Sequence, residues 1–565
     1  MGNLARQITK GVKGVILLLA MIGSVACTPK HKHEPRNHLI ISTEPTASWI
    51  RNFNPLSTAG NPRWASLATI YEPLMIYNRM EGEYIPWLAT GVQWVGDDHQ
   101  QLEINLRAGV QWSDGTEFTA EDVAFTFNLL KQFPALDANG VWSFTKSIDV
   151  LNPTTLRFHF QKAFAPGLLY IAHQAIVAKH VWQDVKDPVS FANPNPVGTG
   201  PYTELTLFES QSYELSRNPY YWQKDKAKIP AIRFPALASN EQVMLNLLKG
   251  NIDLAGNFVP AVDRVFVEKD PDHHEYWFPL VGNMVFLYLN TTKPPYDQVA
   301  VRKALSRALD RPKIVKVAMF NYTEPGHPSG LTQAFEKWRL PAEHPEGTWT
   351  QFQPDQANQE LDAAGFSKGS DGYRRLADGS RWQIDITVVN GWSDWVRAGQ
   401  IIATNLREIG IDAQLRTYDF GAWFSQLQRG EFDAAISWST DTVETYDFYR
   451  WLMSSSTKLD VGEPANGNWH RFSHPDADAA LQALATSFDE DEQMTLVKNL
   501  QLVFMREAPA IPLFPNPAWG LANTRHFTNY PGRDRPYAVL SPNFRPEILQ
   551  VLTQLEKRSD LPKKL

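Results

Sequence analysis

Cysteine is almost absent from this sequence. The 565 residues contain one cysteine, Cys27, and a single thiol cannot close a disulfide within the chain. A small disulfide-stabilised scaffold is therefore excluded. The sequence also lacks the His-Glu-x-x-His motif of zinc peptidases. Its scattered histidines show no metal-ligand spacing, so we expect no metal and no other cofactor. These histidines include His173, His180, His470 and His474.

Long apolar stretches and an excess of basic charge are missing as well. Beyond residue 27 no stretch reaches 18 apolar residues, so we expect no membrane-spanning helix in the body of the chain. Lys and Arg number 54 against 61 Asp and Glu, for a net charge of −7. That balance argues against a nucleic-acid partner. Tryptophan, by contrast, is abundant, with 19 residues.

The first 27 residues have the pattern of an export signal. Arg6, Lys10 and Lys13 precede a run of 12 mostly apolar residues from Val15 to Ala26, which is too short to span a bilayer. The run ends at Cys27, and residues 24–27 resemble a lipobox, the motif in which a bacterial lipoprotein cysteine is acylated. We expect an extracytoplasmic protein, anchored to a membrane through Cys27. The alternative is an ordinary signal peptide cleaved nearby.

The body of the chain mixes strand and helix patterns. Residues 102–107 alternate apolar and polar side chains, as a half-buried strand does. Thr119 and Asp122 have the spacing of a capping box at the start of a helix. Residues 395–409 have helical periodicity and are followed by Gly410 and an alternating segment over residues 411–418. This alternation of helices and strands predicts an α/β fold.

Several motifs, taken together and in order, resemble those of the extracellular solute-binding proteins of family 5. These proteins, also called cluster C, are the receptors of ABC importers for peptides, nickel and oligosaccharides. The motifs span nearly the whole chain. They are Leu88–Val123, Pro196–Tyr202, Arg217–Trp222, Gly250–Asp253, Val301–Leu305 and Ala508–Leu513.

The resemblance implies a two-lobed periplasmic-binding-protein fold, with an extra subdomain in the first lobe and a hinge between the lobes. It implies a monomeric receptor, not an enzyme, that hands a small-molecule solute to an ABC-transporter permease. The domain limits expected on this basis are 1–27 signal peptide, 28–37 linker, 38–60 lobe I, 61–189 extra subdomain, 190–283 lobe I, 284–510 lobe II and 511–565 completion of lobe I.

Three clusters of aromatic and polar residues, at 51–64, 390–395 and 436–449, suggest the class of ligand. Sugars offer hydroxyls for hydrogen bonds and an apolar face for stacking, so a carbohydrate site combines aromatic rings with Asn and Asp. Residues 390–395 follow a strand-like segment, where α/β lobes usually bind ligand. Within the family, the clusters resemble the branch that binds cello- or chito-oligosaccharides. The candidate ligand-binding residues are Asn52, Phe53, Trp64, Asn390, Trp392, Asp394, Trp395, Trp438, Asp441 and Tyr446.

Other interpretations remain open at this point. Each aromatic candidate could instead fill the core, as we expect for Trp94, Trp112, Trp142, Trp182 and Trp222. Peptide receptors of the family hold the ligand's α-amine with an acidic residue, and Asp441 could do that or accept sugar hydroxyls. An oligopeptide is therefore the alternative to a β-linked oligosaccharide. A secreted glycoside hydrolase needs two carboxyl groups about 5–10 Å apart. The sequence gives no specific support for such an enzyme.

Overall fold

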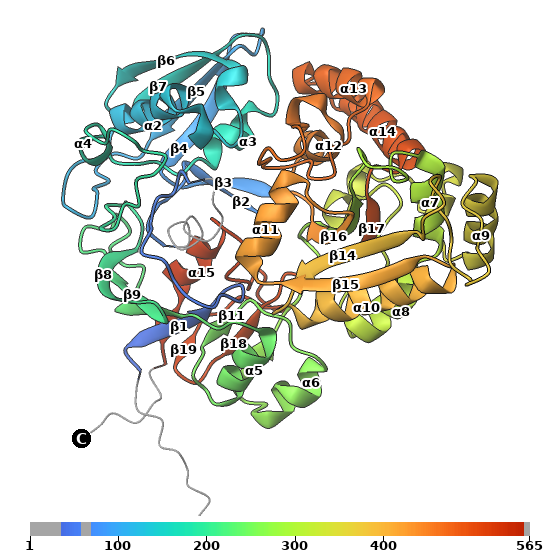
Figure 1. Cartoon of the computed structure of the whole chain (residues 1–565). Coiled ribbons are helices and arrows are strands. Elements are labelled where there is room, and N and C mark those ends of the chain that lie inside the picture. Colours follow the sequence, from blue (N-terminus) through green and yellow to red (C-terminus); the bar gives the residue numbers. More distant parts are fainter. Residues whose placement is uncertain (1–35, 58–68, 559–565) are drawn as a thin grey trace, which may run out of the picture. The chain divides into compact units, whose positions relative to one another are not determined.

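The structure is a computed structural model of the whole chain, and it describes residues 36–57 and 69–558 (Figure 1). Cys27, the predicted signal peptide and Trp64 lie outside the described residues. The elements below all belong to one compact unit, Asn37–Asp560. No helix in the described part of the chain is both long enough and apolar enough to cross a membrane.

A seven-stranded sheet, hereafter sheet I, joins distant parts of the chain (Figure 1). Strand β1 pairs in parallel with β10 and β11, while the remaining pairs are antiparallel. In order across the sheet the strands are β12 (His274–Tyr276), β18 (Leu521–Asn523), β11 (Leu254–Ala255), β1 (His38–Ser42), β10 (Ala231–Pro235), β9 (Ser212–Arg217) and β8 (Tyr202–Glu209). The helices of this region are α5 (Asn240–Leu248), α6 (Val262–Val265) and α15 (Ile548–Gln554).

Between β1 and β8 the chain builds a four-stranded antiparallel sheet. Strand β5 buries alternate residues, as its sequence predicts, and the Asp122 carboxylate accepts a hydrogen bond of 2.9 Å from the Thr119 N–H at the start of α2. The strands, in spatial order, are β4 (Ala89–Val95), β5 (Gln101–Leu106), β7 (Thr155–Phe160) and β6 (Thr145–Asn152). The other elements are the hairpin β2 (Met75–Asn78) and β3 (Glu83–Pro86) and the helices α2 (Ala120–Gln132), α3 (Gly167–Ala172) and α4 (Lys179–Trp182).

A five-stranded sheet, hereafter sheet II, forms the second centre of the fold. Strands β14, β15 and β16 run parallel, and β13 is antiparallel to its two neighbours. The order is β15 (Asp412–Tyr418), β14 (Gln383–Val389), β16 (Ala434–Trp438), β13 (Met284–Leu289) and β17 (Ile511–Pro515). The predicted helix over 395–409 and the following strand are confirmed as α10 (Ser393–Glu408) and β15, with Gly410 between them at φ 89°.

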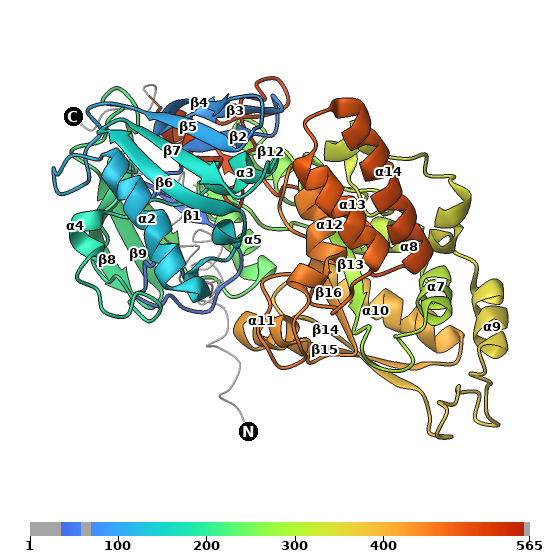
Figure 2. The ribbon, with the colours of Figure 1, turned by 90° about the horizontal axis from the view of Figure 1, so that it is seen from above.

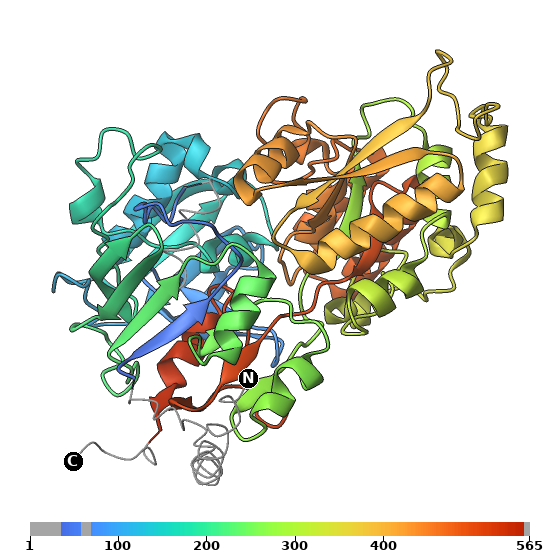
Figure 3. The same ribbon diagram turned by 60° about the horizontal axis from the view of Figure 1, so that its bottom comes forward.

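Helices cover both faces of sheet II. Side chains of a strand alternate between faces: Val285, Leu287 and Leu289 of β13 join one apolar cluster, while Met284, Phe286 and Tyr288 join another. Helix α10 packs along β14 and β15 (Figure 3), and α12, α13 and α14 pack on one another (Figure 2). The helices are α7 (Val299–Arg307), α8 (Arg311–Lys313), α9 (Pro354–Ala363), α10, α11 (Phe420–Arg429), α12 (Thr445–Met453), α13 (Pro475–Thr486) and α14 (Glu490–Glu507).

Two segments connect the sheets. The chain passes from β12 to β13 through residues 277–283 and returns from β17 to β18 through residues 516–520. The limits expected at residues 284 and 511 stay predictions. Strand β17, which spans the second of them, pairs with β13 of sheet II.

Two glycines of the Pro196–Tyr202 motif let the backbone pass very close to a neighbouring segment. A Cβ on Gly198 would lie 2.1 Å from the carbonyl oxygen of Ile70, and one on Gly200 equally close to that of Thr69. No side chain fits at either position. The motif therefore defines the fold, and it does not line the cavity described below.

A buried carboxyl group lies beneath this motif. Glu72 accepts hydrogen bonds from Trp87 Nε1 at 2.7 Å, Tyr221 Oη at 3.1 Å and Trp222 Nε1 at 3.1 Å. Burial disfavours the charged form and raises the pKa of Glu72 to about 7 despite these donors. The folded state therefore holds a proton that the unfolded chain releases near its ordinary pKa.

This proton makes stability depend on pH, and we expect Glu72→Gln to remove that dependence. Because the folded-state pKa is raised, the contribution of Glu72 is complete below the ordinary pKa of 4.5 and is lost as the pH rises through about 7. Urea unfolding between pH 4.5 and 8 should show the wild type losing stability relative to the variant by about 1 kcal/mol per pH unit across this window. A difference that stays constant with pH would contradict the assignment.

Candidate functional site

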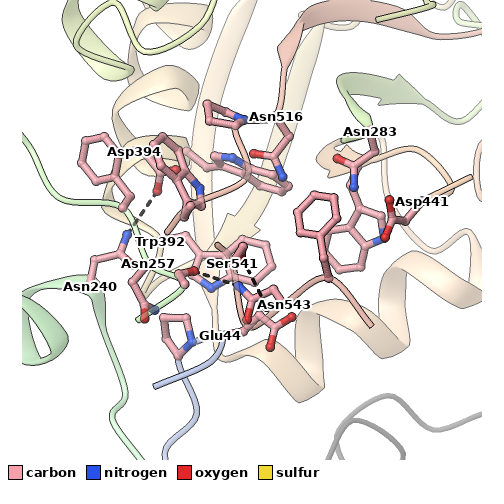
Figure 4. A pocket seen from close by; sticks show the side chains of 18 of the residues that line it. Glu44, Asn240, Asn257, Asn283, Trp392, Asp394, Asp441, Asn516, Ser541 and Asn543 are labelled. Carbon is pink, nitrogen blue, oxygen red and sulfur yellow. Dashed lines mark hydrogen bonds between the residues drawn. The ribbon is translucent and has the colours of Figure 1, made fainter. Parts of the chain in front are cut away.

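A cavity of about 440 Å³ lies where segments from both sheets meet (Figure 4). Its size falls within the range of roughly 300–1,000 Å³ typical of small-molecule sites. The region of sheet I contributes residues 44–45, 240, 256–258 and 541–545. Sheet II contributes residues 392–395 and 438–441, and the two connections contribute Asn283 and residues 516–519. A solute in this cavity touches both halves of the fold.

Three tryptophans form one wall of the cavity. The Trp392 ring centroid lies 4.8 Å from that of Trp395 and 5.7 Å from that of Trp438. Trp438 ends β16 and Trp392 follows the end of β14, and these two strands are parallel neighbours. Their carboxyl ends therefore meet at one edge of sheet II, as the sequence pattern predicts. Trp395 is buried, whereas Trp392 and Trp438 are partly exposed.

Three further aromatic residues, none of them from sheet II, also line the cavity. Trp519, from the second connection, lies 5.4 Å from Phe258 in an edge-to-face arrangement. Phe544 is the third, and the Arg79 guanidinium sits 4.9 Å from its ring centroid. Flat apolar surfaces thus face the cavity from both halves of the fold, where they can hold the faces of a ring-shaped group.

Between the aromatic rings lie polar atoms that have no partner. Trp392 Nε1 and Asn257 Nδ2 are unused donors, and the Oδ1 atoms of Asn283, Asn516 and Asn543 are unused acceptors. All five atoms are buried, and within the part of the chain that the structure describes none of them makes a hydrogen bond. A buried polar group without a partner costs about 1–3 kcal/mol. Because these atoms are buried, a ligand that donates and accepts hydrogen bonds reaches them only when their side chains turn toward the cavity.

The charged groups that line the cavity already have partners. Arg545 donates to Glu44 at 2.9 Å, and Arg79 donates from Nη2 to Asp441 Oδ1 at 3.0 Å. Asp394 accepts from Asn240 Nδ2 at 3.2 Å, and burial raises the pKa of its carboxyl to about 6. The polar groups left to meet a ligand are mainly neutral amides and indole N–H groups.

The structure brings together five of the ten candidate residues: Trp392, Asp394, Trp395, Trp438 and Asp441 all line this cavity. Phe53 does not, because it is fully buried and packs edge-to-face on Phe208 at 6.0 Å and on Tyr213 at 5.8 Å.

Three other candidates are also absent from the cavity lining. The Asn52 side chain accepts a hydrogen bond from the Asn54 N–H within a turn. Asn390 is exposed, and its backbone N–H donates to Tyr418 where β14 and β15 end. Tyr446 packs edge-to-face on Phe164 at 5.8 Å. Trp64 lies outside the described residues.

Sequence reasoning missed the asparagines of the cavity. Asn257, Asn283, Asn516 and Asn543 lie in loops scattered over nearly 300 positions of the chain. Local signals existed for two of them, because Asn257 follows the short strand β11 closely and Asn516 directly follows β17, as Trp392 follows β14. The five tryptophans expected in the core do lie outside the cavity lining: Trp112 and Trp182 are fully buried, and Trp94, Trp142 and Trp222 pack against the same apolar cluster.

Two sequence patterns that could suggest other chemistry have structural explanations. Residues 365–369 match Gly-x-Ser-x-Gly, yet they follow helix α9 instead of a strand, and Ser367 is exposed. They do not form the strand–turn–helix elbow of a hydrolase nucleophile. The second pattern is the run His273-His274-Glu275, which could suggest a metal site. In the structure His274 stacks on Phe266 at 4.1 Å, while His273 pairs with Asp270. Among residues 36–57 and 69–558, no group of three or more His, Cys, Asp or Glu could hold a metal ion.

Comparison with known proteins identifies relatives over most of the chain. The model of the bacterial extracellular solute-binding proteins, family 5 (middle), matches residues 83–460. The glutathione-binding protein GsiB of Escherichia coli K12 is 25% identical over 435 residues, which are 74% of this chain and 78% of that protein.

Solved structures share the fold over nearly its whole length. A mannohexaose-bound periplasmic oligopeptide-binding protein of an ABC transporter from Thermotoga maritima has a TM-score of 0.84 at 25% identity, covering 93% of this chain and 100% of that one. NikZ from Campylobacter jejuni, in complex with Ni(L-His), has a TM-score of 0.76 at 19% identity, covering 92% of this chain and 99% of that one. These likenesses confirm the predicted two-lobed α/β fold.

Proposed function

The chain belongs to the bacterial extracellular solute-binding proteins of family 5 and is a substrate-binding receptor of an ABC importer, and we propose that its solute is a β-linked oligosaccharide of the cello or chito type. Members of this family are periplasmic receptors, not enzymes, and deliver small-molecule solutes to membrane permeases. The proposed ligand site is the cavity between the two sheets. Its proposed contacts are Trp392, Trp438 and Trp519 for stacking and the cavity asparagines for hydrogen bonds.

The observation that carries this proposal is the pairing of aromatic walls with unpartnered neutral polar groups. A sugar ring has an apolar face that stacks on indole and phenyl rings. Its hydroxyls each donate and accept, so they can satisfy both Trp392 Nε1 and the Oδ1 atoms of Asn283, Asn516 and Asn543. The Thermotoga protein with the same fold was crystallised with mannohexaose bound, which is in keeping with an oligosaccharide in a cleft of this architecture.

An oligopeptide is the alternative solute, and the names of several relatives point to it. A peptide brings a cationic amine and an anionic carboxylate, and both need charged partners. Asp441, the residue expected to hold the amine, is paired with Arg79, and Arg545 is paired with Glu44. A peptide would have to separate these ion pairs, whereas a neutral sugar would leave them intact. This difference favours the oligosaccharide.

The proposal also covers the hinge, the oligomeric state and the membrane anchor of the receptor. We place the hinge at residues 277–283 and 516–520, the two connections between the sheets. Because the cavity is lined from both sides, a bound solute would stabilise the closed arrangement of the lobes. We further propose that the receptor works as a monomer and that acylation of Cys27 anchors it to the membrane.

A thermal-shift screen tests the solute class. The purified protein would be heated with cello-oligosaccharides, chito-oligosaccharides and peptides of two to five units. A ligand that binds only the folded state stabilises it by about 2.7 kcal/mol at one hundred times its Kd. We expect the melting temperature to rise with oligosaccharides and to stay constant with peptides. A rise with peptides alone would overturn the proposal.

A further inference from the structure

Beside the cavity, the two halves of the fold touch each other directly. Residues 238–240 lead into helix α5 on the sheet I side, and Gly391 stands between β14 and α10 on the sheet II side. The Asn240 N–H donates to the Gly391 carbonyl oxygen at 3.1 Å. The Asn240 side chain donates from Nδ2 to Asp394 Oδ1 at 3.2 Å (Figure 4). Residues 238–240, 391 and 394 are called the closing contact below.

The backbone bond of the closing contact serves an N–H group that its own helix does not satisfy. Asn240 is the first residue of α5, and the first N–H groups of a helix have no acceptor inside that helix. The side chain of the N-cap residue, Ser239, accepts from the Gln242 N–H instead. The acceptor for Asn240 therefore comes from the other half of the fold, and separation of the halves releases this N–H to water.

The closing contact leaves no room for a side chain at Gly391. A Cβ on Gly391 would lie 2.4 Å from the carbonyl oxygen of Ala238, and 3.4 Å from the carbonyl carbon of Ala238 and from Ser239 Cα. All three are backbone atoms of the sheet I half, and they cannot turn aside as the end of a flexible side chain can. The φ angle of Gly391 lies outside the left-handed region that favours glycine. Glycine is therefore required by the approach of the two halves and not by the turn in which it stands.

We propose that Gly391 is a positioning residue for closure, and that its missing side chain lets the two halves close fully over the solute. The inference rests on the proposed function, in which the solute binds between the halves. It adds a residue that sets the affinity without lining the cavity. When the halves are apart, the Cβ of Gly391→Ala meets none of the three backbone atoms, so the substitution penalises the closed arrangement alone. A solute binds less tightly when the arrangement that holds it is less populated.

Calorimetric titration of Gly391→Ala with cellopentaose and chitopentaose tests this inference. Gly91→Ala, in strand β4, is the matched control: a Cβ there meets nothing within 4 Å, its φ angle is also outside the left-handed region, and it does not line the cavity. We expect Gly391→Ala to raise Kd at least tenfold and Gly91→Ala to keep it within twofold. Without solute, both variants should melt at the wild-type temperature or slightly above it, because a strain-free replacement of glycine by alanine restricts the unfolded chain.

Hydrogen exchange of the Asn240 N–H supplies a readout that a purely local role of Gly391 would not change. Saturating sugar should slow this exchange in the wild type and in Gly91→Ala, and Gly391→Ala should lose most of the slowing.

Two results would overturn the inference while the proposed function stands. One is an unchanged Kd in Gly391→Ala, and the other is a lower melting temperature of solute-free Gly391→Ala alone, which would place the role of the glycine within its own half. If neither sugar binds the wild type, the proposed function fails, and exchange without solute still decides on the closing contact. Slower exchange of the Asn240 N–H in the wild type than in Gly391→Ala would support the contact, and equal rates would overturn it.

Discussion

Replacing Trp392 with alanine is expected to weaken oligosaccharide binding by about 1–3 kcal/mol, or about 5- to 150-fold in Kd. Trp392 contributes both kinds of contact at once, because its ring forms part of the aromatic wall and its Nε1 is an unused buried donor. Removing the side chain takes away a stacking surface and leaves a ligand hydroxyl without its partner. Calorimetric titration of the variant with the tightest-binding sugar measures the loss.

Trp338→Ala is the matched control for this substitution. Trp338 is also a half-buried tryptophan that packs on a sheet II cluster, but it does not line the cavity. We expect its removal to lower the melting temperature without changing Kd. Equal affinity in the wild type and Trp392→Ala, or equal losses in both variants, would show that Trp392 does not contact the solute.

Replacing Arg79 with methionine is expected to lower the free energy of unfolding by about 3–5 kcal/mol, because it leaves a buried carboxylate without its counter-ion. The Arg79 side chain is 8% exposed and that of Glu547 is 0% exposed, and they are joined by a contact of 3.0 Å. Asp441, the other partner, is 37% exposed, so water screens its share of the interaction. Urea unfolding at pH 7 measures the loss.

The pH dependence of this loss identifies its cause. Burial raises the pKa of Glu547, while Arg79 lowers it, so removing Arg79 raises the pKa further. A carboxyl with a raised folded-state pKa stabilises the fold when protonated, and this contribution is lost as the pH rises. The deficit of Arg79→Met should therefore shrink as the pH falls toward the ordinary pKa of glutamate. The double variant Arg79→Met/Glu547→Gln, which carries no buried charge there, should recover most of the stability at pH 7. A deficit that is independent of pH and persists in the double variant would point to lost packing instead.

The aromatic wall could be predicted from the sequence because its parts are local features. Trp392 and Trp438 stand at the ends of two strand-like segments, and parallel strands bring such ends together. Phe53 shows the limit of this reasoning. Its polar and aromatic neighbours in the sequence also made it a candidate, yet its ring packs against Phe208 and Tyr213, contacts that no local pattern reveals.

The polar half of the site and the second connection depend on long-range structure. Asn283 and Asn516 lie more than 200 residues apart in the sequence, and they meet because the Asn516 N–H donates to the carbonyl of Asn283 beside the β13–β17 pair. The same pairing places β17 in sheet II. The family resemblance that suggests a limit near residue 511 rests on short motifs, and short motifs carry no information about which sheet a strand joins.

The central claim is that the cavity between the sheets takes a neutral oligosaccharide. Calorimetric titration at pH 7 with ligands of matched length, namely cellopentaose, chitopentaose and a pentapeptide, tests it most directly. The account predicts saturable one-to-one binding of at least one of the sugars and no binding heat from the peptide. Saturable binding of the peptide with none for either sugar would contradict it, and would assign the ion pairs of Asp441 and Arg545 to the recognition of peptide termini.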